Sequence, residues 1–187
     1  KDLNENREAY KKSSFKTIVH TACGYPSDPK VSNDIFIREQ LNLFDNLISL
    51  SHNKFIYISS IDVCLSDKTP YIDLKRLIEQ KLRNNHPNYL IIRPGLLIGS
   101  GMKFNTIAKL CLSKYPIVTL SKYSYYYLSF YSEILSAIVS EQNGTLTVCF
   151  HNSVNVKSIA TRFSSQPTWG SFSYKPMIDD GKTRFYK

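Results

Sequence analysis

The sequence has few of the residues and patterns that define several large classes of protein. Only 7 of its 187 residues are glycine, and they nowhere stand in the G-x-G-x-x-G spacing of a dinucleotide-binding turn. The four cysteines are far apart, with no C-x-x-C and no nearby pair of histidines, which argues against a zinc site and a disulfide framework. We therefore expect no metal site, and free thiols in a reducing cytoplasm.

Long apolar runs are also missing. No run approaches the roughly 20 apolar residues that a helix needs to cross a bilayer, and the opening stretch KDLNENREAYKK is polar throughout. We therefore expect no membrane partner and a cytoplasmic location.

Positive charge is the one excess in the composition. Lysine and arginine number 24 against 15 acidic residues, for a formal net charge of +9. Such a charge favours anionic partners such as nucleotides or nucleic acids, but the lysines are scattered along the chain. Charge therefore limits the kind of partner only weakly.

Three short apolar runs predict buried strands of a parallel sheet. They are KTIVHTAC (16–23), KFIYISSI (54–61) and NYLIIRPG (88–95). Between them, residues from about 32 to 51 and from 69 to 82 have the three- and four-residue spacing of amphipathic helices. Ser32 or Asn33 is expected to cap the first helix, and Thr69 the second, with Pro70 at its first position. This order predicts a βαβαβ unit of an α/β protein.

The pattern changes after Gly101. Short helices are expected over 105–113 and 130–141 and from Ser153 or Asn155 to 163, and short strands over 116–120 and 145–150. The final twenty-odd residues have no clear period. We predict a first domain over 1–104 and a small lobe over 105–187, with the 145–150 strand as one that could return to the main sheet.

Tyr71 and Lys75 are four residues apart and share one face of the second helix. Ser60 ends the preceding predicted strand and Pro94 the following one, and open α/β sheets bind ligands at the carboxyl ends of their strands. An ammonium near a phenol favours the phenolate, so Tyr71 could exchange a proton with a substrate hydroxyl while Ser60 holds the oxygen. The alternative, which the spacing alone favours, is that Tyr71 packs against the helix while Lys75 extends to solvent.

Four segments in order resemble the extended short-chain dehydrogenase/reductases, the NAD-dependent epimerase/dehydratase group. They are KTIVHTAC, KFIYISSIDV, TPYIDLKRLIE and YLIIRPGLLIGSG, with a fainter likeness in SYYYLSFYSEILSAI and SVNVKSIATRF. The resemblance implies a parallel Rossmann-like sheet with a small C-terminal substrate lobe. It also implies NAD or NADP as cofactor and a small-molecule substrate, with a nucleotide sugar as one candidate.

The resemblance also implies roles for particular residues. Tyr71 matches the catalytic base, Ser60 the catalytic serine with Ser59 as its neighbouring candidate, and Lys75 the lysine that binds the nicotinamide ribose and tunes the tyrosine. The implied cofactor-binding residues are Asp2, Leu3, His20, Ala22, Lys75, Pro94 and Leu96.

The sequence departs from the family in several places. The glycine-rich turn belongs before Lys1, and Gly99-Ser100-Gly101 follows the wrong strand and lacks the third glycine. We therefore expect the chain to be the later part of a cofactor domain without its N-terminal half. The arginine that commonly meets a nucleotide-sugar phosphate is missing near 126–133, where tyrosines stand, so this substrate is in doubt.

Two functions stay open. The first is an NAD(P)-dependent oxidoreductase or epimerase. The second is a non-catalytic relative that serves as a structural subunit or an RNA-binding module. It is supported by the missing glycine turn, the basic charge and the run KYSYYYLSFY (122–131), which could stack bases. For that run, the explanation that we favour is that its tyrosines are strand and helix faces in the lobe. The family also favours a homodimer through the two long helices.

Overall fold

The structure is a computed structural model that describes residue 10 and residues 13–21, 32–102, 104–178 and 183–186, the last range by its backbone alone. The chain divides into two compact units. Unit 1 comprises residues 1–59, 67–92 and 141–145, and unit 2 comprises 60–66, 93–140 and 146–187. Residues 60–66 and 93–104, which the sequence pattern places in the first domain, thus belong to unit 2. The division into a cofactor domain and a substrate lobe stays a prediction.

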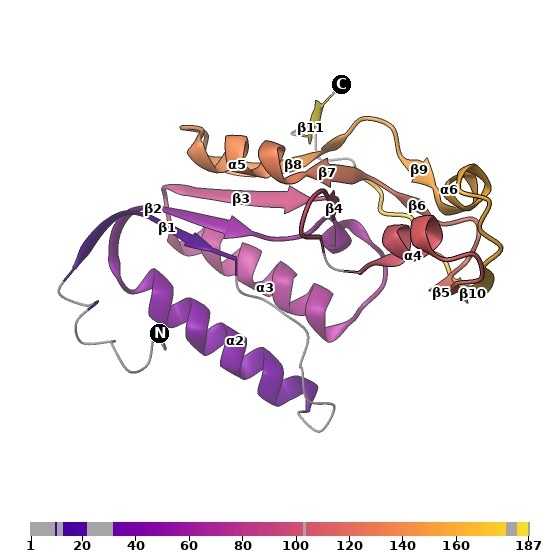
Figure 1. Cartoon of the computed structure of the whole chain (residues 1–187). Coiled ribbons are helices and arrows are strands. Elements are labelled where there is room, and N and C mark those ends of the chain that lie inside the picture. The colour runs from indigo at the N-terminus through magenta and orange to yellow at the C-terminus, as the bar shows by residue number, and fades with distance from the viewer. Residues whose placement is uncertain (1–9, 11–12, 22–31, 103, 179–182, 187) are drawn as a thin grey trace. The chain divides into compact units, whose positions relative to one another are not determined.

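Unit 1 contains the predicted βαβαβ unit (Figure 1). Its elements are β1 (Ser14–His20), α2 (Asn33–Ile48), β2 (Ser51–Ile58), α3 (Pro70–Asn85) and β3 (Tyr89–Pro94), whose last two residues belong to unit 2. β1 pairs in parallel with β2, and β2 with β3. β2 begins and ends three residues earlier than the sequence predicts, because polar Ser51 still pairs with Ser14 through the backbone.

Both long helices begin where capping residues predict. The Ser32 side chain accepts a hydrogen bond from Ile35 N at 3.3 Å. The Thr69 hydroxyl accepts one from Ile72 N at 3.2 Å, and Pro70 occupies the first position of α3. Each cap satisfies a backbone N–H that the helix itself leaves without a partner. The predicted caps are therefore confirmed, with Ser32 rather than Asn33 at the first helix.

An aromatic and aliphatic core holds unit 1 together. It consists of Phe36, Phe44, Phe55, Tyr57, Leu74, Ile78, Leu82 and Ile91. The predicted four-residue repeat on α3 is the stripe that supplies three of these residues, all fully buried. The rings of Phe44 and Phe55 meet edge to face, with their centroids 5.6 Å apart. The core therefore fixes α3 against β2, and α3 carries the candidate site.

Unit 2 is built from shorter elements. They are η1 (Ile61–Cys64), β4 (Leu96–Ile98), α4 (Thr106–Leu112), β5 (Ile117–Leu120), β6 (Tyr125–Tyr126), β7 (Leu128–Phe130), α5 (Tyr131–Val139), β8 (Gly144–Phe150, shared with unit 1), β9 (Val154–Asn155), α6 (Val156–Arg162), β10 (Thr168–Phe172) and β11 (Thr183–Tyr186). β8 pairs in parallel with β11, and the main sheet has the order β1-β2-β3-β8-β11. The predicted α/β class with a parallel sheet is confirmed.

Several strands of unit 2 escape prediction from the sequence. β6 and β9 have two residues each and pair with each other in antiparallel fashion, which is too short for any hydrophobic period to appear. β10 lies in the region without a period and pairs with β5. A Cβ added to Gly170 in β10 would lie 2.1 Å from Thr119 O, so the close approach of these two strands requires glycine.

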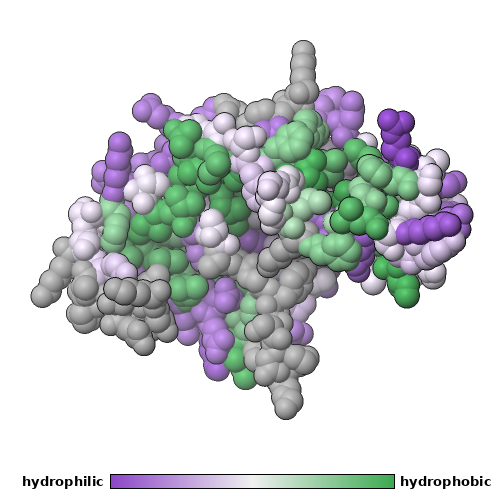
Figure 2. All heavy atoms as spheres, viewed as in Figure 1, coloured by the Kyte–Doolittle hydropathy of each residue, from purple (hydrophilic) through white to green (hydrophobic). Residues whose placement is uncertain are grey.

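α5 is an apolar helix whose buried and exposed faces both carry hydrophobic side chains. Ile134 and Ala137 are buried within unit 2. Leu135 and Val139 are 61% and 80% exposed, and hydrophobic residues gather over α5 in Figure 2. Helical spacing therefore predicts this element correctly, while its burial depends on contacts that the sequence does not reveal.

A buried carboxylate joins the end of β2 to α3. Glu79 is 1% exposed; it accepts a hydrogen bond from Ser59 Oγ at 2.6 Å and forms an ion pair with Arg83 at 2.5 Å. Burying a charge is costly unless it is paired and hydrogen-bonded. The Ser59 hydroxyl is thus part of the structural framework of unit 1.

His20 is the other buried polar group of this core. It is 3% exposed, and its ring stacks on Tyr57 with centroids 5.5 Å apart. Among the described residues, none makes a hydrogen bond with its Nε2 atom. Burial, with the positive charge of Lys75 as a second cause, lowers the pKa of His20 from 6.5 to about 4. The neutral imidazole is therefore the form that the folded chain favours.

We expect Ser59→Ala to lower the free energy of unfolding by roughly 1.5 to 3 kcal/mol, because a buried carboxylate loses a charge-assisted hydrogen bond. Urea unfolding followed by circular dichroism measures this change. The matched control is Asp73→Asn, which removes the exposed Arg76–Asp73 pair at 3.5 Å and should change stability by less than about 1 kcal/mol. Equal losses in the two variants would show that the Ser59–Glu79 bond is not a stabilising contact.

The His20 environment predicts a loss of stability in acid. The folded-state pKa of His20 lies below the unfolded value, so the unfolded chain binds more protons than the folded chain between pH 6.5 and about 4. The contribution of His20 to the free energy of unfolding is therefore full above pH 6.5 and is lost as the pH falls toward 4. The loss should reach roughly 2 to 3 kcal/mol. Unfolding free energies measured in urea at both ends of this window should fall further for the native chain than for His20→Phe. His151 is exposed, so the control His151→Phe should lose as much unfolding free energy across this window as the native chain.

Candidate active site

Tyr71 and Lys75 lie in the first turns of α3, and Lys75 points inward. The lysine is 3% exposed, and its Nζ atom donates a hydrogen bond to Ile58 O at 2.9 Å. The same nitrogen lies 5.3 Å from the centroid of the half-buried Tyr71 ring. The alternative in which Lys75 extends to solvent is therefore wrong.

Tyr57 completes this group, and the sequence analysis missed it. Its ring is fully buried on β2, with Lys75 Nζ 5.0 Å from its centroid. The stacked His20 ring comes from β1, where His20 and Tyr57 are register partners. The available signal was the alternation of β2, which puts Tyr57 on the same side of the strand as Ser59. Unit 1 thus brings three of its elements together around one buried ammonium.

The Lys75 ammonium lies in an environment that lysine rarely occupies. Lysine is almost never fully buried unless it is paired. Here the backbone carbonyl of Ile58 and two aromatic rings face the ammonium, and a desolvated cation over a ring gains about 2 kcal/mol or more. This environment holds the Lys75 ammonium beside the Tyr71 ring.

The two serines after β2 have different tasks. Ser59 is 4% exposed and its hydroxyl donates to Glu79, so it serves the core. Ser60 is half-buried and its Oγ accepts a hydrogen bond from Asp62 N at 3.1 Å as the cap of η1. In the described part of the chain, no group accepts a hydrogen bond from the Ser60 hydroxyl. Of the two candidates, Ser60 is therefore the serine whose hydroxyl could donate a hydrogen bond to a ligand.

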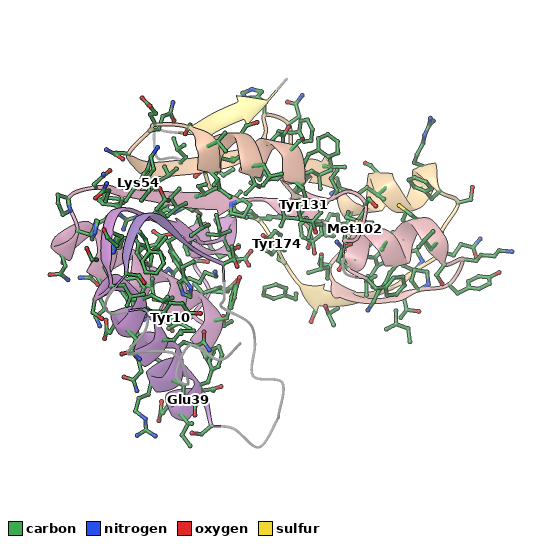
Figure 3. The ribbon with its side chains drawn as sticks, turned by 60° about the vertical axis from the view of Figure 1, so that its left-hand side comes forward. Tyr10, Glu39, Lys54, Met102, Tyr131 and Tyr174 are labelled. Atoms are coloured by element: carbon green, nitrogen blue, oxygen red, sulfur yellow. The ribbon has the colours of Figure 1, made fainter. Side chains whose placement is uncertain are left out.

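Unit 2 places a second polar group beside Ser60. Asp62 accepts a hydrogen bond from the Tyr174 hydroxyl at 2.6 Å, and Tyr174 is labelled in Figure 3. The Tyr174 ring lies 4.9 Å from that of Tyr126. Burial, followed by the charge of Asp62, raises the pKa of Tyr126 against the opposing effect of a hydrogen bond with Thr106. Sequence reasoning missed this group because Asp62 and Tyr174 are 112 positions apart.

The strand end at Pro94 is held rigidly within unit 2. Gly95 N donates to Ser129 Oγ at 2.8 Å, and that buried hydroxyl donates to Val148 O at 2.6 Å. A Cβ added to Gly95 would lie 2.2 Å from Tyr127 O, so only glycine fits here. Leu96 N donates to Tyr127 O at 2.7 Å and begins β4. The predicted contact of Pro94 and Leu96 with a cofactor stays a prediction.

The predicted residues therefore fall into separate groups. His20, Tyr71 and Lys75 come together in unit 1, while Ser60, Pro94 and Leu96 belong to unit 2. Asp2, Leu3 and Ala22 lie outside the described residues. Within the residues that the structure describes, no three His, Cys, Asp or Glu side chains gather as metal ligands would, and no helix is long and apolar enough to cross a membrane.

Comparisons with known proteins were made by sequence and by structure. No family model matches the sequence, and no curated protein matches it. Solved structures do match the fold.

Three of these structures illustrate the likeness. UDP-glucose 4-epimerase of Thermus thermophilus, solved with NAD, matches at 12% identity and a TM-score of 0.65 over 94% of this chain and 74% of that chain. The dTDP-glucose 4,6-dehydratase DesIV of Streptomyces venezuelae, with NAD and TYD bound, matches at 11% identity and a TM-score of 0.67 over 96% of this chain and 73% of that chain. RMD of Pseudomonas aeruginosa, complexed with NADPH, matches at 17% identity and a TM-score of 0.64 over 91% of this chain and 72% of that chain. The chain therefore has the Rossmann-like α/β fold of the epimerase and dehydratase structures.

Proposed function

We propose that this chain provides the proton-transfer residues of an NAD(P)-dependent oxidoreductase or epimerase that acts at a substrate hydroxyl or carbonyl. The observation that carries the proposal is the buried ammonium of Lys75, 5.3 Å from the Tyr71 ring. A residue that only stabilises a helix gains nothing from such burial, because desolvating a charge costs free energy. Charged groups placed in this way are typical of functional sites.

Tyr71 is the proposed acid and base. Its phenol returns a proton to a substrate oxygen in reduction, and its phenolate removes that proton in oxidation. The phenolate form is favoured by the Lys75 charge, which acts through a dry environment where electrostatic interactions are strong. Lys75 is held in place by the Ile58 carbonyl, so it does not need to move during the reaction.

Ser60 is the proposed donor to the substrate oxygen. Its lone pair already caps η1 through Asp62 N, which fixes the side chain and leaves its hydroxyl hydrogen for a ligand. Asp62 in turn accepts from Tyr174, so the segment that carries Ser60 is anchored in unit 2. We propose Ser60, rather than Ser59, as the serine that donates to the substrate oxygen.

In unit 1, the buried Lys75 ammonium fits the nicotinamide end of NAD or NADP, where it would hold the ribose. The family resemblance implies that His20, Pro94 and Leu96 also contact the cofactor. When bound, the nicotinamide supplies or accepts the hydride. The sequence offers no glycine-rich turn for the pyrophosphate, so the proposal is confined to the nicotinamide end.

A nucleotide sugar is the proposed substrate class, and this chain would bind it without the arginine that is missing near 126–133. Similar folds include the UDP-N-acetylglucosamine 4-epimerase of Methanobrevibacter ruminantium M1 in complex with UDP-N-acetylmuramic acid. The net charge of +9 also favours an anionic substrate.

We expect Tyr71→Phe to lower kcat by roughly 10²- to 10⁴-fold, the usual contribution of a positioned acid or base. The loss of kcat is measured by incubating each variant with a panel of nucleotide sugars and NAD(H) or NADP(H) and quantifying the product by chromatography. The matched control is Tyr115→Phe, because Tyr115 also has a lysine 5.2 Å from its ring but is 64% exposed. If both variants turn over at the native rate, Tyr71 is not the base.

We expect saturating NAD(H) or NADP(H) to raise the Tm of the protein, because a ligand that binds only the folded state stabilises it by about 2.7 kcal/mol at 100 times its Kd. Lys75→Met should abolish this shift. The control Lys81→Met removes an exposed lysine paired with Asp45 and should keep it. If neither the oxidised nor the reduced form of NAD or NADP raises the Tm of the native protein, the proposed cofactor is wrong.

A further inference from the structure

One part of unit 2 is basic and has no acidic residue. We call residues 105–130 and 153–175 the basic lobe; they pack around a core of Ile107, Leu110, Val118, Leu120, Val156, Ile159 and Ala160. Its cations are Lys109, Lys114, Lys122, Lys157, Arg162 and Lys175, and neither range contains Asp or Glu. All six except the half-buried Lys109 are exposed. The ion pairs that the structure describes lie instead on α2 and α3.

The basic lobe also leaves large aromatic rings in solvent. Tyr115, Tyr123 and Phe163 are 64%, 60% and 53% exposed. Two of these rings carry a cation: Lys114 Nζ lies 5.2 Å from the centroid of Tyr115, and Lys122 Nζ lies 5.2 Å from that of Tyr123. Trp169 and Tyr126, in contrast, pack against the lobe core and are partly buried.

Hydrogen bonds place the two lysine–tyrosine pairs at opposite ends of α6. Asn155, which caps α6, donates to Lys122 O at 3.3 Å. Beyond the other end of the helix, Gln166 N donates to Lys114 O at 2.7 Å. The helix has seven residues, a length of roughly 10 Å at about 1.5 Å per residue.

Exposed cations and rings therefore follow one another along this helix. Lys157 lies in its first turn and Arg162 at its last position. Exposed Phe163 comes directly after it. Hydrophobic and hydrophilic residues lie next to each other over α4 and α6 in Figure 2.

We propose that the basic lobe binds single-stranded nucleic acid, with Tyr115 and Tyr123 as stacking platforms and the surrounding lysines and arginine facing the phosphates. Alternation of rings and cations is the chemistry that single strands need, because their bases are free to stack while their backbone is anionic. A duplex keeps its bases stacked and offers phosphates alone. This activity is additional to the proposed enzyme function and does not depend on it.

The surface differs from the one that the sequence run KYSYYYLSFY predicts. Within that run Tyr126 packs against the lobe core and Tyr125 is only 39% exposed. Tyr123, at 60%, is the most exposed ring of the run, and its counterpart is Tyr115, eight positions earlier.

The test is fluorescence anisotropy of a labelled oligouridylate and a labelled oligothymidylate with the purified chain. Tyr115→Ala and Tyr123→Ala should each weaken binding by roughly 5- to 150-fold, the loss expected when one stacking ring is removed. Tyr115→Phe and Tyr123→Phe keep the ring and should bind like the native chain. Circular dichroism of every variant checks that the lobe is folded.

Salt dependence tests the cations separately. Lys114→Gln and Lys122→Gln should each reduce the slope of log K against log salt by about 0.7, the value for one phosphate contact on a single strand. The control Lys81→Gln, on α3 of unit 1, should leave the slope unchanged. A duplex of the same length should bind more weakly than the single strand, and its affinity should be the same for the native chain and the tyrosine variants.

Four outcomes would overturn the proposal. They are no binding at low salt, binding that is indifferent to both Tyr→Ala variants, complete competition by UDP, and equal competition by an acidic peptide. Complete competition by UDP would assign the lobe to a nucleotide substrate, and equal competition by the peptide would assign it to an acidic protein. The NAD(H) melting shift, measured on the same variants, should stay at its native value.

Discussion

The hydrogen bond from Lys75 Nζ to the carbonyl of Ile58 is the contact on which the candidate site depends. It ties the second turn of α3 to the last residue of β2, so a charge that would otherwise point to solvent is held against Tyr57 and Tyr71. Burial of His20 is the main cause of its lowered pKa, and the nearby charge of Lys75 adds to it. The buried cation thus acts on the protonation of a neighbouring side chain as well as contacting two aromatic rings.

Two adjacent hydroxyls after β2 divide the structural and chemical tasks. Ser59 and Glu79 satisfy each other inside unit 1, and this fixes the point at which the chain leaves the strand. Ser60, one residue later, begins η1 and belongs to unit 2. A serine whose hydroxyl already donates to a buried carboxylate is a poor choice for a substrate contact, since breaking that bond leaves a desolvated charge without its partner. The structural role of Ser59 is therefore an argument for Ser60.

Local signals were sufficient for the long elements of this chain. Thr69 and Pro70 define the start of α3, and the repeat of Leu74, Ile78 and Leu82 defines its buried face, because capping and helical spacing involve residues at most four positions apart. The inward direction of Lys75 was not predictable, since a lysine on a helix usually extends to solvent. Its burial depends on Tyr57 and Ile58, which come from another element. Contacts between distant segments were equally hidden: Asp62 and Tyr174 meet through one hydrogen bond but carry no shared period or motif.

Burial gives different chemistry to the same pair of residue types in the two units. In unit 1, Lys75 is buried and contacts the half-buried Tyr71 ring, and a contact between a desolvated cation and a ring is worth about 2 kcal/mol or more, whereas the exposed pairs of the basic lobe gain only about 0.5 to 1 kcal/mol from theirs. The buried ammonium is held in place by the Ile58 carbonyl and is therefore proposed to tune a proton transfer. The exposed pairs gain little free energy from their own contact. A nucleic-acid base can therefore stack on the ring, and a phosphate can bind the ammonium, at a small cost in free energy. Burial, rather than the Lys–Tyr combination itself, therefore separates the two proposed activities of this chain.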